Sequence, residues 1–129
     1  MTHSPNLKVV LPPFLQSFFE ESGYCDTTYF EGRLASRLRI RCQASMCIEY
    51  SPPSIKRVEK NSLVLIKDIS RRGISVLAHE QIWPEESLYI RFQGRQIRSK
   101  VVRCRRLGDS CWECGAEIFF FKNLEDESN

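Results

Sequence analysis

Apolar and polar residues alternate with a period of two along much of the chain after residue 36. Between residues 37 and 50, one set of alternate positions is apolar and the other is mainly polar or charged. Successive side chains of a β-strand point to opposite faces, so this pattern predicts a long strand with one buried face. The residues expected on the buried face are Leu38, Ile40, Cys42, Ala44, Met46, Ile48 and Tyr50. The segment Ser51-Pro52-Pro53-Ser54 ends the strand.

Five further strands are predicted from shorter apolar runs separated by turn residues. They cover residues 62–69, 74–78, 87–92, 96–106 and 111–118. The inward side chains expected on two of them are Leu88, Ile90 and Phe92, and Trp112, Cys114, Ala116 and Ile118. Six short strands at regular spacing predict an all-β fold, a six-stranded antiparallel β-barrel.

The two ends of the chain fall outside this strand pattern. Residues 1–31 are predicted to form an N-terminal extension with a short helix, residues 32–122 the barrel domain, and residues 123–129 an acidic tail. The N-terminal helix is expected to begin at Pro12-Pro13 and to end at Gly23, and a second short helix is expected over residues 119–124.

An apolar cluster marks one side of the predicted N-terminal helix. Its members are Phe14, Leu15, Phe18 and Phe19. They pack either against their own domain or against a partner protein or a second copy of the chain. Packing against the domain is favoured, because exposed apolar patches of that size are uncommon on monomers.

Length and charge suit a single domain with an anionic partner. The chain has 129 residues and a net charge of +3, and without the acidic residues 125–127 its charge is +6. Thirteen of its nineteen basic residues are arginine, which pairs with phosphates and carboxylates through two parallel hydrogen bonds. The longest apolar runs are too short to span a bilayer, and the N-terminus lacks the order of a secretory signal. No membrane insertion is expected, and a cytoplasmic location is the default.

The six cysteines raise the question of disulfides or a metal site. A cytoplasmic location favours free thiols. Cys111 and Cys114 form a Cys-x-x-Cys pair, but residues three apart on a strand point to opposite faces. His3 and His79 are the only histidines, so the ligands for zinc are too few. Neither a metal nor a cofactor is expected.

The sequence contains no recognisable catalytic set. Neither a Ser-His-acid nor a Cys-His combination lies in the context that such sites require. His79 falls at the end of the third predicted strand, and Glu85 and Glu86 are expected on a solvated turn. A binding protein is therefore expected rather than an enzyme.

The segment from Asp68 to Gly73 carries the most distinctive motif, Asp-x-Ser-x-x-Gly, between two predicted strands. Its carboxylate and hydroxyl suit a ligand with base edges and phosphates. Taken alone, the motif also describes a tight turn in which Asp68 and Ser70 bond nearby amides and Gly73 adopts a positive φ. An arginine pair, Arg33 and Arg37, lies upstream, but this spacing is common in so arginine-rich a chain.

The order of these elements resembles the PilZ domain family over about residues 31 to 120. An arginine pair leads into the first strand, and the Asp-x-Ser-x-x-Gly motif, the second motif of the family, follows the second strand. A glycine precedes the last apolar residues of the closing strand. The matching positions are Arg33, Arg37, Asp68, Ser70, Gly73 and the segment Cys114-Gly115-Ala116-Glu117-Ile118. The resemblance leaves the N-terminal extension unexplained.

The resemblance implies a six-stranded barrel that binds cyclic di-GMP, a bacterial second messenger. Arg33 and Arg37 would lie on a flexible segment that folds over the ligand and grips its phosphates and guanine edges. Asp68 and Ser70 would face a guanine from the barrel surface. Gly73 belongs to the same motif as Asp68 and Ser70, and Gly115 belongs to the matching segment of the closing strand. A carboxylate can accept hydrogen bonds from guanine N1 and N2, while arginine pairs with O6 and N7.

Three positions refine this expectation. Many members of the family have an additional arginine directly before the pair, a position linked to binding two stacked ligands. Gly32 occupies it here, which favours one ligand per domain. Arg71 and Arg72 lie inside the second motif and act either as further phosphate contacts or as solvated turn charges.

Three functions follow from the sequence. The first is a cyclic di-GMP receptor that relays the level of the messenger to an unidentified protein partner, with homodimerisation open. The second is a PilZ-like interaction module without nucleotide binding. The third, an RNA- or single-strand-binding barrel, rests on Arg39, Arg41, Arg98, Arg103, Arg105 and Arg106. Nucleic acid is disfavoured, because the expected outward positions of the first strand carry no aromatic residue for base stacking.

Overall fold

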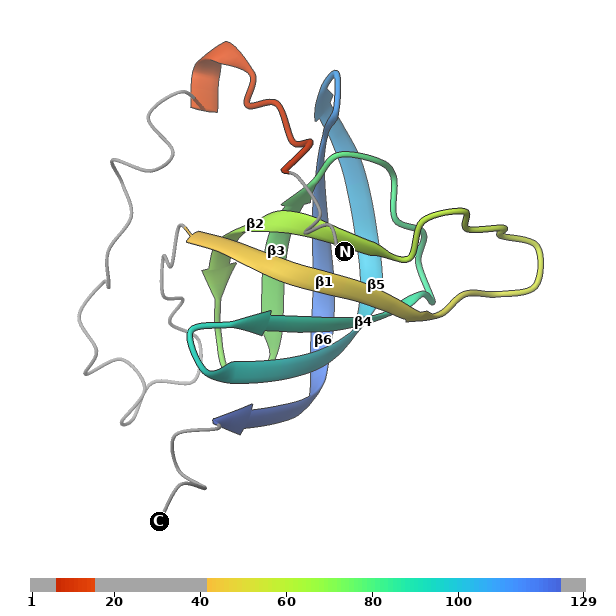
Figure 1. Cartoon of the computed structure of the whole chain (residues 1–129), viewed down its shortest axis with the longest axis vertical. Coiled ribbons are helices and arrows are strands. Elements are labelled where there is room, and N and C mark those ends of the chain that lie inside the picture. The colour runs from red at the N-terminus through yellow and green to blue at the C-terminus, as the bar shows by residue number, and fades with distance from the viewer. Residues whose placement is uncertain (1–6, 16–41, 124–129) are drawn as a thin grey trace, which may run out of the picture.

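Six antiparallel strands form a closed barrel in the computed structural model, which describes residues 7–15 and 42–123 (Figure 1). The strands are β1 (Cys42–Tyr50), β2 (Asn61–Ile69), β3 (Gly73–Ala78), β4 (Ser87–Phe92), β5 (Arg95–Gly108) and β6 (Cys111–Asn123). Their order around the barrel is β1-β2-β3-β6-β5-β4, and β1 pairs with β4 to close it. The predicted barrel is confirmed, and its six strands lie close to the expected ranges.

The barrel interior is the hydrophobic core, and the alternation in the sequence identifies most of it. On β1, Ala44, Met46 and Ile48 are buried. The expected inward residues of β4 are all buried, and those of β6 belong to the same core or pack against it. Cys42 is partly buried against this core, and Leu38 and Ile40 lie outside the described residues. Tyr50 departs from the expectation, since it is 54% exposed rather than buried. The register between β1 and β4 shifts between Ile48 and Tyr50, and this irregularity turns Tyr50 outward.

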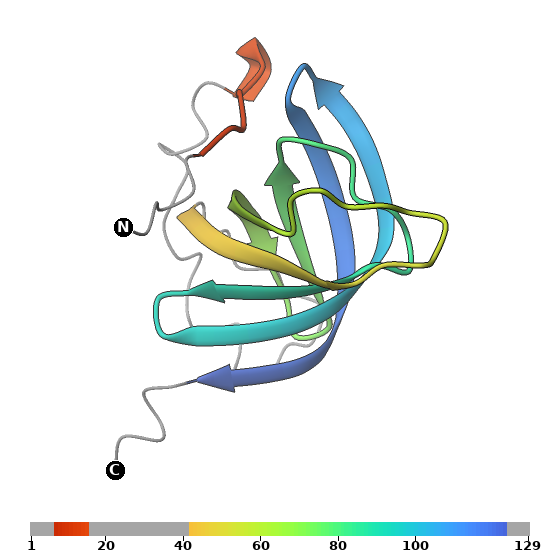
Figure 2. The ribbon, with the colours of Figure 1, turned by 45° about the vertical axis from the view of Figure 1, so that its right-hand side comes forward.

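β5 and β6 form the longest hairpin of the barrel and curve along its whole height (Figure 2). The short helix expected over residues 119–124 is wrong, because β6 continues as a strand to Asn123. Asn123 pairs with Arg95 and Phe121 with Ile97, so the edge of β5 supplies cross-strand partners along this segment. Pairing with β5 thus overrides the local helical tendency.

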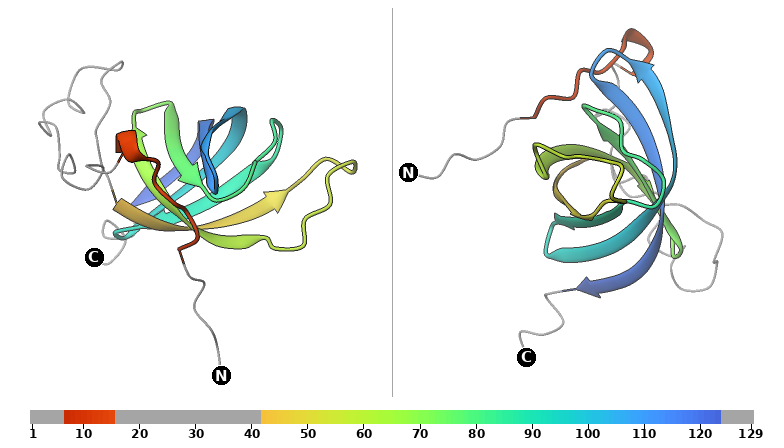
Figure 3. Two further views of the ribbon diagram at one scale, coloured as in Figure 1. Left: turned by 90° about the horizontal axis from the view of Figure 1, so that it is seen from above. Right: turned by 90° about the vertical axis from the view of Figure 1, so that its right-hand side faces the viewer.

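A short N-terminal segment covers part of the outside of the barrel (Figure 3). Its one helical turn is a 3-10 turn at Pro13–Leu15, and the rest of the expected helix lies outside the described residues. The segment forms an outer cluster, composed of Val9, Leu11, Leu15 and Leu107 packed against Leu65, Leu77 and Cys111. Packing on the domain is therefore confirmed for Leu15, whereas Phe14 is 68% exposed. Phe18 and Phe19 lie outside the described residues.

Cys111 and Cys114 lie on opposite faces of β6, as expected for residues three apart on a strand. Cys111 is buried in the outer cluster, and Cys114 is buried in the barrel core. The five described cysteines are free thiols, and Cys25 lies outside the described residues. Within the described part of the chain, no helix is long and apolar enough to cross a membrane.

Candidate ligand-binding site

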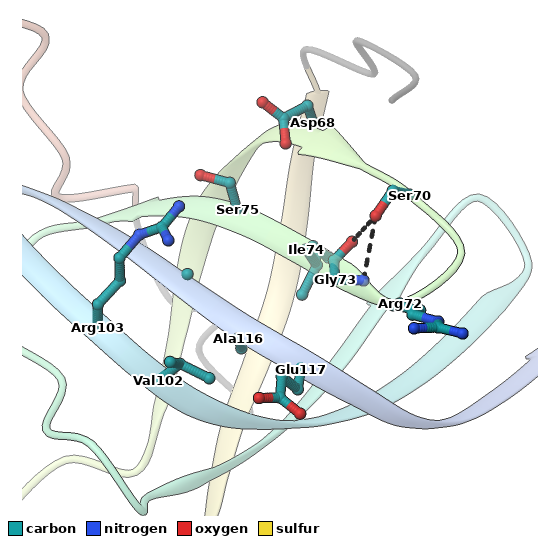
Figure 4. Close-up of a pocket in the computed structure, with 11 residues that line it drawn as sticks. Asp68, Ser70, Arg72, Gly73, Ile74, Ser75, Val102, Arg103, Ala116 and Glu117 are labelled. Atoms are coloured by element: carbon teal, nitrogen blue, oxygen red, sulfur yellow. Dashed lines mark hydrogen bonds between the residues drawn. The ribbon is translucent and has the colours of Figure 1, made fainter. Parts of the chain in front are cut away.

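A shallow pocket of about 290 Å³ lies on the outer surface of the barrel, where β2, β3, β5 and β6 lie side by side (Figure 4). Its lining residues are Asp68, Ser70, Arg72, Gly73, Ile74, Ser75, Val102, Arg103, Gly115, Ala116 and Glu117. The three motif residues and Gly115, which the sequence places more than forty positions later, therefore meet at one site. Antiparallel pairing of β3 with β6 brings them together.

The motif turn is held by its own serine. Ser70 donates its backbone N–H to the Gly73 carbonyl at 2.8 Å, and its hydroxyl accepts the Gly73 N–H at 3.2 Å. The Arg72 carbonyl accepts the Ile118 N–H at 2.8 Å, which joins the turn to β6. These bonds are the turn chemistry expected of a serine at this place. Ser70 therefore shapes the rim of the pocket through the backbone.

Gly73 serves close packing and not a left-handed turn. The positive φ expected at this glycine is wrong, since Gly94 is the described glycine with a positive φ. A Cβ on Gly73 would lie 3.3 Å from the Ala116 carbonyl oxygen of β6. Gly73 pairs with Glu117 at the start of β3, so a side chain here would press against a backbone that the sheet holds in place.

Four outward-facing residues form a row across the pocket. Asp68 on β2 pairs with Ser75 on β3, Ser75 pairs with Gly115 on β6, and Gly115 pairs with Arg103 on β5. Figure 4 shows Asp68, Ser75 and Arg103 on three of these strands. The row places a carboxylate at one end and a guanidinium at the other, with two of the smallest residues between them. We call these four residues the Asp68–Arg103 row.

Two β-bulges turn the ends of this row outward. In β2, Ile66 pairs with Val76 and Asp68 with Ser75, which leaves Lys67 as an additional residue. Alternation from the buried Ile66 would place Asp68 inside the barrel, but the bulge puts Asp68 outside and Ile69 in the core.

The second bulge has the same effect on β5. Val101 pairs with Ala116 and Arg103 with Gly115, which leaves Val102 as the additional residue. Val101 is buried, and both Val102 and Arg103 are exposed. Bulges of this kind re-aim side chains next to binding sites.

Two members of the row, Ser75 and Arg103, were not predicted as site residues from the sequence, and Arg103 is the charged one. Its side chain lies across Gly115, because a Cβ on Gly115 would be 3.2 Å from Arg103 Nε and 3.4 Å from its Cζ. In the sequence, Arg103 stands among thirteen arginines and belongs only to the hypothesis of nucleic acid binding. A signal was nevertheless present, since Arg103 breaks the inward alternation of Ile97, Ser99 and Val101.

The remaining predicted site residues divide into three groups. Arg72 lines the pocket and is exposed, so its guanidinium is available at the rim. Arg71 is exposed but does not line the pocket. Arg33 and Arg37 lie outside the described residues.

An ion cluster on the same outer face stands beside the row. Glu113 on β6 accepts a hydrogen bond from Lys67 Nζ, and another from Arg105 Nε at 2.7 Å. Burial acts to raise the pKa of Glu113, but the bonds from Lys67 and Arg105 outweigh it and hold the pKa below its usual value. Lys67 and Arg105 are therefore both paired with Glu113. The cationic residues that line the pocket are Arg72 and Arg103.

A second charged group is fully buried, away from the pocket. Glu86 is 0% exposed, so its expected place on a solvated turn is wrong. Its carboxylate accepts hydrogen bonds from Arg57 Nε at 2.9 Å, from Ser51 Oγ at 2.6 Å and from the Trp83 N–H at 2.7 Å. Arg57 also donates to the Gln81 carbonyl at 2.8 Å. These bonds tie the connection between β1 and β2 to the connection between β3 and β4, which indicates a structural role.

Arginine and aromatic side chains stack on the outer face of β4, β5 and β6. Arg98 pairs with Tyr89 and with Phe120, and its guanidinium carbon lies 4.4 Å and 5.2 Å from their ring centroids. The exposed Tyr50 adds an aromatic ring to β1, where none was expected to face outward. Arg98 occupies one face of each stacked ring and also donates to Glu49 at 3.0 Å. The positive charge of Arg98 and one face of each of the two rings are therefore already in contact with other groups of the protein, which leaves less for a nucleic acid to bind.

No family model, curated protein or solved structure matches the chain. In the part of the chain that the structure describes, no group of three or more His, Cys, Asp or Glu side chains is arranged to hold a metal ion. Function is therefore inferred from the pocket and its residues.

Proposed function

We propose that this protein is a cyclic di-GMP receptor of the PilZ type that relays the level of the messenger to a partner protein in the cytoplasm. The observation that carries the proposal is the Asp68–Arg103 row, in which the motif carboxylate and an arginine face each other across Ser75 and Gly115. A purine with donors on one edge and acceptors on another matches such a pair of groups.

The row fits the edges of a guanine. The Asp68 carboxylate can accept hydrogen bonds from guanine N1 and N2, and a guanidinium such as that of Arg103 can donate to O6 and N7. Three interstrand spacings separate β2 from β5, about 14 Å between their backbones, so the two side chains have room to approach a base from opposite ends. Ser75 and Gly115 supply a low floor on which the base can lie.

A pocket of this size would enclose only part of the proposed ligand. Its volume of about 290 Å³ lies just below the range of about 300–1,000 Å³ for small-molecule sites. One base and an adjoining phosphate fit this space better than a whole cyclic dinucleotide. According to the family resemblance, Arg33 and Arg37 would cover the rest of the ligand and pair with its phosphates, and Arg72 would contact it at the rim of the pocket.

A relay requires a surface that a partner can recognise. Phe119 and Phe121 on the last part of β6 are 62% and 50% exposed, although they belong to a strand. Apolar side chains that remain exposed in this way are typical of interaction sites. The same residues favour the second candidate function, an interaction module that binds its partner without nucleotide.

Calorimetric titration of the purified chain with cyclic di-GMP tests the proposal. We expect saturable heat with one ligand per chain, and loss of binding in Arg37→Ala and Asp68→Ala while the circular dichroism spectrum keeps its β signal. Cyclic di-AMP is the matched control ligand, because adenine lacks the N1 and N2 donors and the O6 acceptor. A folded protein that gives no saturable heat at high micromolar cyclic di-GMP would refute the proposal and leave the interaction module.

A further inference from the structure

Two thiols of the barrel core are in direct contact. Cys104 on β5 pairs directly with Cys114 on β6, and their sulfur atoms are 2.8 Å apart. Directly opposed residues of antiparallel strands have Cα atoms about 4.5–5.5 Å apart, which lies inside the range of about 4.4–6.8 Å found for disulfides. The backbone therefore presents the two sulfurs at a separation that a disulfide can bridge without large movement.

The two thiols differ in burial. Cys114 is fully buried, whereas Cys104 is partly exposed at the edge of the same core. The hydrogen bond between the two thiols lowers the pKa of Cys104, and the same contact together with burial raises the pKa of Cys114. Cys104 is therefore the thiol that becomes a thiolate first and that a reagent in solution can reach.

We propose that Cys104 and Cys114 are a dithiol site that a low-molecular-weight disulfide of the glutathione type oxidises to a cross-strand disulfide. The Cys104 thiolate attacks one sulfur of the reagent, the S–S bond of the reagent breaks, and one thiolate leaves and takes up a proton. Cys114 then loses its proton to solvent and attacks Cys104 Sγ, which expels the second thiolate. The protein loses two electrons and two protons, and one small disulfide becomes two thiols.

The other described cysteines provide internal comparisons. Cys111 lies in the outer cluster on the opposite face of β6, so it cannot replace Cys114 as the partner of Cys104. Cys42 and Cys47 are on β1, which is separated from β5 by β4 in the barrel. Burial raises the pKa of Cys42, which also makes it a poor nucleophile. A selective reaction at Cys104 and Cys114 is thus expected.

The experiment treats the full chain with oxidised glutathione, blocks remaining thiols with N-ethylmaleimide and identifies the peptides by mass spectrometry. The expected product is an intramolecular link between Cys104 and Cys114 that dithiothreitol reverses. Trypsin cuts after Arg106 and Lys122, so the peptide with Cys114 also contains Cys111. Cys111→Ser removes this ambiguity and should keep the link.

Two variants test the order of the steps. Cys114→Ser should retain glutathione on Cys104, because no second thiol can displace it, and Cys104→Ser should leave Cys114 unmodified. The proposal is overturned if the folded wild-type chain carries glutathione on Cys104 without a link, or if Cys47 reacts while this pair does not. If a variant fails to fold, the peptides of the wild type and of Cys111→Ser decide the outcome. The measurement detects only the sulfur link, so its result is independent of nucleotide binding.

Discussion

The Arg103 side chain lies across Gly115 of the neighbouring strand, with Nε 3.2 Å from the position that a Cβ on Gly115 would occupy. The absence of a side chain at Gly115 lets the guanidinium lie low over the sheet, in line with Ser75 and Asp68. Arg103 is exposed and flexible, so it can move aside if Gly115 gains a methyl group. Gly73 differs, because its close neighbour is the Ala116 carbonyl of the backbone.

This difference predicts opposite outcomes for two glycine variants. Gly115→Ala should change the free energy of unfolding by no more than about 0.5 kcal/mol, since a surface side chain absorbs the contact. It should nevertheless weaken the binding of cyclic di-GMP, by about 1–3 kcal/mol if the Arg103 contact is lost. Gly73→Ala should cost about 1–2 kcal/mol of stability, because the sheet must shift. Urea unfolding and calorimetry of both variants check this, and equal stability losses would contradict it.

Asp68→Asn should weaken the binding of cyclic di-GMP without unfolding the protein. The amide keeps the shape of the carboxylate but replaces one acceptor with a donor, so the pair of bonds to guanine N1 and N2 is lost at a cost of about 1–3 kcal/mol. Asp109→Asn is the matched control, because Asp109 is 95% exposed in the β5–β6 hairpin and bonds Arg106. Calorimetric titration should show weaker binding for Asp68→Asn alone, and an equal loss in the two variants would argue against the proposed site.

Glu86→Gln should be among the most destabilising single changes in the barrel. The substitution removes the charge that compensates Arg57, whose side chain is only 9% exposed, and breaking a buried pair costs about 3–5 kcal/mol. Glu80 also contacts Arg57, at 3.3 Å, but its side chain is 47% exposed. Glu80→Gln should therefore change stability by no more than about 1 kcal/mol. Thermal and urea unfolding distinguish the two, and similar midpoints would show that the buried pair contributes little.

The same carboxylate predicts a loss of stability in acid. Burial acts to raise the pKa of Glu86, but bonds from Arg57, Ser51 and the Trp83 N–H outweigh it, and the net pKa lies below the ordinary value of 4.5. The unfolded chain takes up its proton at the ordinary value and the folded chain only at lower pH. The contribution of the Glu86 carboxylate to the free energy of unfolding is therefore complete above about pH 4.5 and is lost as the pH falls through the lowered pKa. Urea midpoints between neutral and acid pH should show a shallower fall in Glu86→Gln than in the wild type.

Leu15→Ala should destabilise the protein, although Leu15 lies outside the barrel sequence. Leu15 packs against the buried outer cluster around Leu65 and Leu77, and removing part of a half-buried apolar side chain costs about 1–2 kcal/mol. The adjacent Phe14 is 68% exposed, so Phe14→Ala should change stability by no more than about 0.5 kcal/mol. Differential scanning calorimetry gives both values, and a larger effect of Phe14→Ala would show that the N-terminal segment packs differently.

Local patterns in the sequence were sufficient to predict most of the barrel. Alternation identified the core-facing positions of β4 and β6 and the three buried positions of β1, because side-chain direction along a strand depends on neighbouring residues alone. The pattern failed at Tyr50 and at residues 119–123, where a register shift and pairing with β5 decide the conformation. The motif residues and Gly115 were predicted as site residues from the sequence, but their proximity depends on the pairing of β3 with β6.

By itself, the sequence determined the strand periodicity, the motif turn and the arginine-rich character of the chain, all of which are local or compositional properties. Only the tertiary structure decided which side of the sheet Asp68 and Arg103 face, because bulges at Lys67 and Val102 reverse the alternation. It also decided the contact of Cys104 with Cys114 and the burial of Glu86 beside Arg57. These relationships depend on the register between strands and on chain segments that meet only when the barrel closes.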